Sequence, residues 1–219
     1  MKIKELYEIV CPTEYRNIRV EIKEFDKNKN DITSPMDFVV LDSTEEQLYA
    51  NCIDKESFVG TSEFISIYDT EVEDFFLYLS EEDHSQTIEL TTKKLKKYFA
   101  KVSEAYVYLS HMILHEIGHY QQYLNLNKNV FDYTSLDYAE KVGIDAEYQR
   151  MNDKIHQRII KQGKKPVPTK GEKKLLADIS RRYRRLPTEK EADDFAYSMM
   201  KETVEKIAHK QKTENKRNL

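Results

Sequence analysis

Residues Ser103–Leu124, SEAYVYLSHMILHEIGHYQQYL, are the most informative part of this 219-residue chain. They contain no proline and a single glycine, Gly118, and therefore predict one long helix. Apolar residues lie on several faces of this helix, which is typical of a helix buried in a protein core. The same stretch contains the pattern H-E-x-x-H at residues 115–119, which is typical of a metal-binding helix.

The spacing of this motif places His115 and His119 on one face of the helix, because residues four apart lie one above the other. Their imidazoles could therefore bind one Zn²⁺ ion at ~2.0–2.1 Å. Glu116 could act as the general base toward a metal-activated water, because zinc lowers the pKa of such a water toward ~7. His111 lies ~12 Å from His119 along the helix axis, too far for both to bind one ion. We interpret His111 as a core or supporting residue.

A third ligand must come from another part of the chain, and the best candidate segment is EKEADDFA, residues 189–196. Glu189 and Asp193 are four residues apart on an expected helix and share a face. Glu189 could bind the metal, while Asp193 accepts the ring N–H of a ligating histidine. Glu191 does not share that face and is the local alternative, and Glu147 is the distant one.

Together, HEIGH and EKEADDFAYSMM resemble the metal-site motifs of gluzincin metallopeptidases. The second block is similar to the E-x-x-A-N-x-F-A segment of ImmA/IrrE-type peptidases and to the E-x-E-A-D-x-x-A segment of the HtpX and CAAX-prenyl-protease group. The resemblance implies that Glu189 is the third ligand and that Asp193 is the supporting residue. The 70-residue interval from His119 to Glu189 is closer to the prenyl-protease group, so we expect Ser135–Arg185 to be inserted between the ligand helices.

The resemblance also implies that the H-E-x-x-H helix packs beneath a small mixed sheet, whose antiparallel edge strand holds an extended peptide. Alternating apolar and polar residues predict strands at Asn17–Phe25 and Phe64–Tyr68, and a short apolar run predicts another at Asp37–Leu41. We expect Phe64–Tyr68 to be the edge strand. The segment Asp74–Leu79 fits either a strand or a helix.

The rest of the chain has a helical pattern, and with the predicted strands it indicates a single α+β domain. The resemblance implies that the fold of this domain is zincin-like. We expect a strand-rich part over residues 1–88, a helical metal-site part over 89–208 and a frayed basic tail over 209–219. The expected helices, besides the long one, span 91–98, 135–161, 172–185 and 189–208. Thr188 is the predicted N-cap of the last of these, with Glu191 as its capping-box partner.

The net charge of −4 is unevenly distributed. Residues 1–149 contain 15 Lys/Arg and 29 Asp/Glu, a balance of −14, whereas residues 150–219 contain 20 and 10, a balance of +10. The basic part includes the cluster Arg181-Arg182-Tyr183-Arg184-Arg185, which could bind nucleic acid or an acidic partner. Packing of the two oppositely charged halves against each other explains the same pattern without a ligand.

The composition excludes several classes of protein. No stretch approaches the ~20 apolar residues of a membrane span, and the first residues lack the apolar core of a secretory signal. The two cysteines, Cys11 and Cys52, are too few for a disulfide framework or a cysteine zinc cluster. We therefore expect a cytoplasmic protein without membrane contact.

These observations favour a cytoplasmic zinc-dependent metallopeptidase that acts on a protein or peptide substrate, a transcriptional regulator being the substrate that the ImmA/IrrE resemblance suggests. Manganese or iron could also occupy a His₂Glu site. The alternative is a catalytically inactive zincin-fold protein whose basic C-terminal half binds nucleic acid or an acidic partner. An oxyanion stabiliser is also needed, and the sequence leaves four candidates: His156, Tyr148, Tyr183 and Tyr197.

Overall fold

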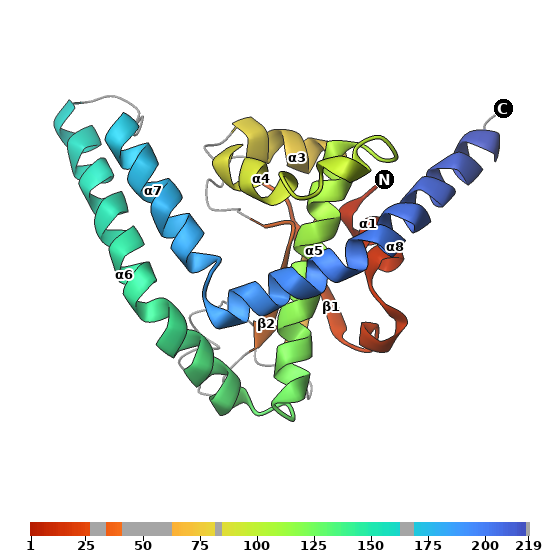
Figure 1. Cartoon of the computed structure of the whole chain (residues 1–219), viewed down its shortest axis with the longest axis horizontal. Helices are drawn as coiled ribbons and strands as arrows, with labels where there is room; N and C mark the ends of the chain where they lie inside the picture. The colour runs from red at the N-terminus through yellow and green to blue at the C-terminus, as the bar shows by residue number, and fades with distance from the viewer. Residues whose placement is uncertain (27–33, 41–62, 82–84, 163–168, 218–219) are drawn as a thin grey trace.

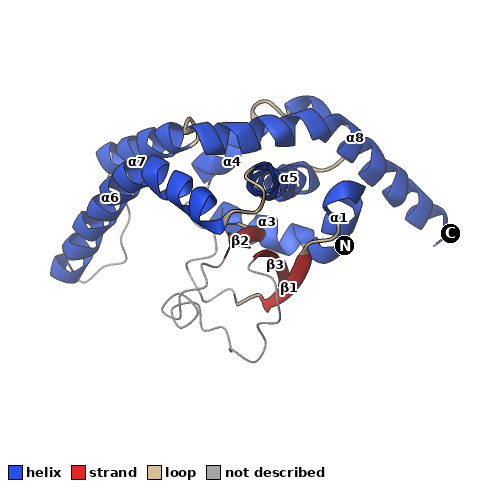
Figure 2. Cartoon of the chain, turned by 90° about the horizontal axis from the view of Figure 1, so that it is seen from below, coloured by secondary structure: helices blue, strands red, loops and turns tan. Residues whose placement is uncertain are grey.

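A small mixed sheet and a helix pair form the centre of the molecule, as the computed structural model shows (Figures 1 and 2). The structure describes residues 1–26, 34–40, 63–81, 85–162 and 169–217. Within these residues the sheet has three strands, in the order β1-β3-β2, and the C-terminal half is helical. The predicted α+β class is confirmed.

The strands are β1 (Arg19–Glu24), β2 (Met36–Val40) and β3 (Glu63–Asp69). Strand β3 pairs with β1 in parallel and with β2 in antiparallel orientation. All three predicted strands are present, although Leu41 lies outside the described residues.

The prediction that Phe64–Tyr68 is the edge strand is wrong, because β3 is the central strand and β2 is the antiparallel neighbour at the edge. Residues 63–67 of β3 are all buried, so the apparent alternation in FISIY does not reflect a solvent-facing side. A central strand is covered on both faces, and its polar Ser66 is buried with the rest.

The N-terminal part contains more helix than the strand-rich prediction allowed. Helix α1 (Ile3–Val10) buries Ile3, Leu6, Tyr7 and Val10, which have helical spacing. Helix α3 (Val72–Glu81) settles the ambiguous segment 74–79 as helical. Helix α4 (Ser85–Thr92) ends where the helix predicted over 91–98 should begin, and only a short 3₁₀ turn follows at Lys96–Tyr98.

Helix α5 (Glu104–Asn125) is the buried helix predicted from the long apolar stretch, and it lies between the sheet and α8 (Pro187–Arg217) (Figure 2). The two helices approach most closely at Gly118, where an added Cβ would lie 2.8 Å from the Cα of Ala192. Only a glycine permits this approach. Beyond it, α8 buries Ala196, Met200, Val204 and Ile207, the residues that hold it on the core.

The chain between α5 and α8 forms a helical arm that projects from the core (Figure 1). Helix α6 (Val130–Gln162) runs beside α7 (Lys170–Tyr183), and the pairs Arg158–Glu172 at 2.8 Å and Arg182–Glu147 at 2.7 Å join them. The arm corresponds to the insertion expected over residues 135–185.

The predicted N-cap of the last helix is wrong, because helix α8 begins at Pro187 and Thr188 lies inside it. The helix continues through the described residues 209–217, and the sequence after Pro187 contains no glycine or proline that would end it. Fraying of this tail stays a prediction. Among the described helices, none is both long and apolar enough to cross a membrane.

Candidate metal centre

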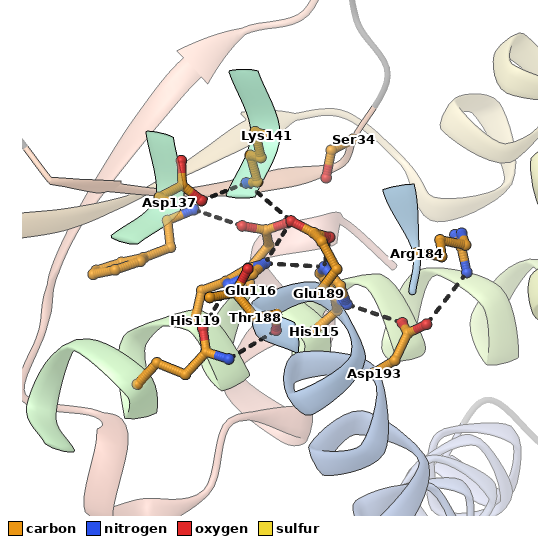
Figure 3. Close-up of polar contacts among 12 residues, drawn as sticks. Ser34, His115, Glu116, His119, Asp137, Lys141, Arg184, Thr188, Glu189 and Asp193 are labelled. Carbon is orange, nitrogen blue, oxygen red and sulfur yellow. Dashed lines mark hydrogen bonds and ion pairs between the residues drawn. The ribbon is translucent and has the colours of Figure 1, made fainter. Parts of the chain in front are cut away.

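His115 and His119 of α5 and Glu189 of α8 point toward one another (Figure 3). The two Nε2 atoms are 3.1 Å apart, Nε2 of His115 lies 3.2 Å from Oε2 of Glu189, and Nε2 of His119 lies 3.6 Å from Oε1. Ligands at ~2.0–2.1 Å from a tetrahedral ion are about 3.3 Å from each other. The three side chains therefore form a His₂Glu group that could hold a metal ion, and within the described residues it is the one such group.

Two features of the helices bring these residues together. The histidines are one turn apart on α5, which places both rings on the same face. Glu189 comes from the first turn of α8, one turn before Ala192, the residue that contacts Gly118. The absence of a side chain at Gly118 therefore lets the first turn of α8 come close enough for its carboxylate to reach both imidazoles.

Asp193 orients the first histidine. Its Oδ1 lies 3.0 Å from Nδ1 of His115, and its Oδ2 lies 3.7 Å from Nη1 of Arg184. Burial lowers the pKa of His115, but the hydrogen bonds to Asp193 and Glu189 outweigh this and raise it to about 9. Asp193 thus contacts the ring of His115, and its role as the supporting residue of a metal ligand stays a prediction. With Nδ1–H donated to Asp193, Nε2 is the atom that faces the ligand group.

Gln122 orients the second histidine, and no motif in the sequence indicated this contact. Its Oε1 lies 2.9 Å from Nδ1 of His119, while its Nε2 donates to the carbonyl of Thr188 at 2.7 Å and to Glu191 at 3.1 Å. The donated N–H groups fix which end of the amide faces the histidine. Glu191, the local alternative ligand, supports Gln122 instead.

The distant alternative ligand, Glu147, lies on the arm and pairs with Arg182 at 2.7 Å, so it also stands apart from the ligand group. The basic cluster containing this arginine is partly neutralised within the chain. Arg182 also contacts Asp178 at 3.1 Å, and Arg181 lies 3.6 Å from the same carboxylate.

Lys141 of α6 is a further member of the site that the sequence did not reveal. Its Nζ lies 2.9 Å from Oε1 of Glu189 and 2.6 Å from Oδ1 of Asp137 (Figure 3). Burial lowers the pKa of Lys141, but the charges of Glu189, Tyr183 and Asp137 and the hydrogen bond to Asp137 together raise it above its usual value, so the ammonium stays protonated. In the sequence, Asp137 and Lys141 look like an ordinary surface pair four residues apart.

Glu189 itself is ionised although it is 3% exposed. Burial raises the pKa of its carboxyl group, but the hydrogen bonds from His115 and His119 hold it well below its usual range. An ionised carboxylate beside two imidazoles supplies the donor atoms of a His₂Glu metal site, and in the metal-free protein Lys141 balances part of its charge.

A cavity of about 470 Å³ opens beside the ligand group. Glu116 lines it together with His115 and Glu189, and the Oε2 atom of Glu116 accepts the backbone N–H of Phe38 in β2 at 3.0 Å. Asp37, the neighbouring residue of β2, also lines the cavity. Burial and the charge of Glu116 raise the pKa of Asp37 to about 6.

The candidates for oxyanion stabilisation divide into two groups. Tyr148 and Tyr183 line the cavity, as does Arg184. The ring of Tyr197 packs on His111 at 4.5 Å, and His156 contacts the Asn152 carbonyl within α6. Only the first group faces the space beside Glu116.

His111 is fully buried behind the site. Its Nε2 lies 3.8 Å from Oδ1 of Asp193, and neither ring nitrogen has a hydrogen-bond partner among the described residues. Burial lowers the pKa of His111 to about 3, so the ring is neutral. It lies outside the ligand group, in the core or supporting position expected of it.

The chain matches no protein-family model, no curated protein and no solved structure. The interpretation of the site therefore depends on the geometry and chemistry of these residues.

Proposed function

We propose that this protein is a zinc-dependent metallopeptidase of the gluzincin type. The observation that carries the proposal is the juxtaposition of a His₂Glu ligand group with Glu116 at the edge of one cavity. A purely structural zinc site is closed by four protein ligands, whereas a catalytic site has three and an open position. Three protein ligands beside a cavity fit the catalytic kind.

When bound, a zinc ion would polarise a peptide carbonyl and lower the pKa of a water molecule toward ~7. In this mechanism Glu116 accepts a proton from the attacking water and passes it to the leaving amine. Asp193 and Gln122 hold the two imidazoles so that their Nε2 atoms face the ligand group. Tyr183 or Arg184 could donate to the oxygen on which negative charge develops.

Strand β2 supports the choice of a peptide as the substrate. Among the described strands it is the antiparallel one at the edge of the sheet, and its Phe38 N–H donates to Glu116. An extended peptide that paired with this strand would pass beside the general base. We infer a protein or peptide substrate in the cytoplasm, with a transcriptional regulator as one substrate suggested by the resemblance to ImmA/IrrE-type peptidases.

The test begins with the metal content of the untagged protein, which we expect to be about one zinc ion per chain. Glu116→Gln should retain the ion and lose hydrolysis of a peptide library, because the amide cannot act as a base. Full activity of this variant would refute the mechanism.

A second pair of variants tests the ligand assignment. Glu189→Ala should lose zinc affinity, and Glu191→Ala, with the same charge change two residues away, should keep most of it. The opposite order would move the third ligand to Glu191.

A further inference from the structure

Two adjacent residues of α6, Glu140 and Lys141, contact the turn of α8 that carries Glu189. Figure 3 shows Lys141 at the Glu189 carboxylate. Oε2 of Glu140 accepts the backbone N–H of Thr188 at 3.0 Å and its hydroxyl at 2.7 Å. Lys141 reaches Oε1 of Glu189 at 2.9 Å, which leaves Oε2 facing His115. The arm therefore contacts both the backbone next to the third ligand and its carboxylate.

The contact made by Glu140 supplies a hydrogen-bond acceptor to the N-terminus of α8. The first N–H groups of a helix have no partner within the helix, and a polar residue at the N-cap usually accepts one of them. Here the residue before Pro187 is Leu186, whose carbonyl accepts the first helical hydrogen bond from Lys190 but whose side chain is apolar. Glu140, 48 residues away from Thr188, supplies the missing acceptor from another helix.

The carboxylate of Glu140 also suits this position because negative charge is favourable at a helix N-terminus. On the other side of the same residue, Gln122 donates to the Thr188 carbonyl at 2.7 Å. Thr188 is thus fixed at its N–H, hydroxyl and carbonyl groups by α6 and α5. The next residue in the chain is the ligand itself.

We propose that Glu140 is a positioning residue for the third metal ligand: by capping α8 from the arm, it fixes the direction from which Glu189 reaches the metal. This inference rests on the proposed metal site. It assigns to the α6–α7 arm a direct part in metal binding, beyond forming one wall of the cavity.

The experiment measures the zinc dissociation constant by competition with a chromophoric chelator. Glu140→Ala should weaken zinc binding about tenfold, the lower end of the range for residues that orient metal ligands. Glu140→Gln retains an acceptor oxygen and should remain within about twofold of the wild type. Equal losses in both variants would show that only the charge of Glu140 acts, and would overturn the proposal.

A matched control and a second background separate positioning from general destabilisation. Glu147→Ala removes the same charge two turns further along α6, where the partner is Arg182, and should leave zinc binding unchanged. In the Glu189→Ala background, Glu140→Ala should cause no further loss, because there is no carboxylate to position. A loss of the same size in both backgrounds would refute the proposal.

The outcomes also distinguish this inference from the proposed function. A wild-type protein that binds no zinc would refute both. A wild-type protein that binds zinc, with unchanged affinity in Glu140→Ala, would refute the positioning role alone.

Discussion

The substitution Gly118→Ala tests the crossing of α5 and α8 that brings the ligands together. The added methyl group would lie 2.8 Å from the Ala192 Cα and 3.1 Å from its carbonyl oxygen, whereas ordinary contact begins at 3.4 Å. The closest obstacle is backbone, so a change of side-chain rotamer cannot relieve it. The helices must separate by about 0.6 Å, the difference between 3.4 and 2.8 Å.

Two opposing effects set the change in stability. Overpacking of this kind costs about 1–3 kcal/mol, while replacing glycine by alanine inside a helix contributes up to about 1 kcal/mol in favour of the variant. We therefore expect a net loss of about 1–2 kcal/mol in the free energy of unfolding. The displacement also exceeds the ~0.5 Å tolerance of a preorganised site, so zinc binding should weaken by about tenfold or more.

Urea unfolding of the metal-free protein measures the first effect, and chelator competition measures the second. Gly143→Ala is the matched control, because an added Cβ there meets no atom within 4 Å. That variant should gain about 0.5–1 kcal/mol and bind zinc normally. If Gly118→Ala behaved like Gly143→Ala in both assays, the reasoning about the helix crossing would be refuted.

Three further predictions concern the side chains around the ligands. Asp193→Ala should weaken zinc binding about 10–100-fold, because His115 loses the hydrogen-bond acceptor at its Nδ1. The control Asp194→Ala, on the exposed side of the helix, should leave zinc binding unchanged. Equal zinc affinities of the two variants in a chelator competition would contradict this. Lys141→Met should lower the free energy of unfolding of the metal-free protein by about 2 kcal/mol in urea, because the buried carboxylate of Glu189 loses its cation. Saturating zinc should restore this loss, and a loss unchanged by zinc would exclude the explanation. The control is Lys206→Met, which removes a lysine from an exposed pair. The pKa of Asp37 is raised from 3.8 to about 6, so the stability it contributes is present below pH 4 and lost as the pH rises through 6. Asp37→Asn should therefore be more stable than the wild type at pH 7, by at most about 3 kcal/mol, and this difference should shrink toward pH 4. If urea unfolding gave a difference that did not depend on pH, the raised pKa of Asp37 would not be its cause.

Local spacing explains how much of the site could be predicted. His115 and His119 share a helix face in any helix, and so do Glu189 and Asp193, so both pairs were readable from the sequence. That these two pairs meet at one site was predicted from the chemistry of the ligands, because two imidazoles need at least one more ligand to bind a metal ion. The α+β class and the three strands also followed from local patterns, two strands from alternation and the third from a short apolar run.

The parts that could not be predicted depend on contacts between distant elements. Gln122, Glu140 and Lys141 act through residues of α8 that lie 48 or more positions away in the chain. Nothing in their local sequence separates them from surface polar residues. The central position of β3 was missed for a related reason, because alternation describes one strand and says nothing of its neighbours.

The arm lies, in chain order, between the histidines and the third ligand, and this order has a consequence for a cut chain. A break between residues 162 and 169 would leave one fragment with both histidines and another with Glu189. If the ligand group binds zinc as proposed, the ion would join two separate polypeptides, so metal would strengthen their association and a chelator would weaken it. The intact fold thus contains the parts of a metal-controlled fragment complementation system, divided between α6 and α7.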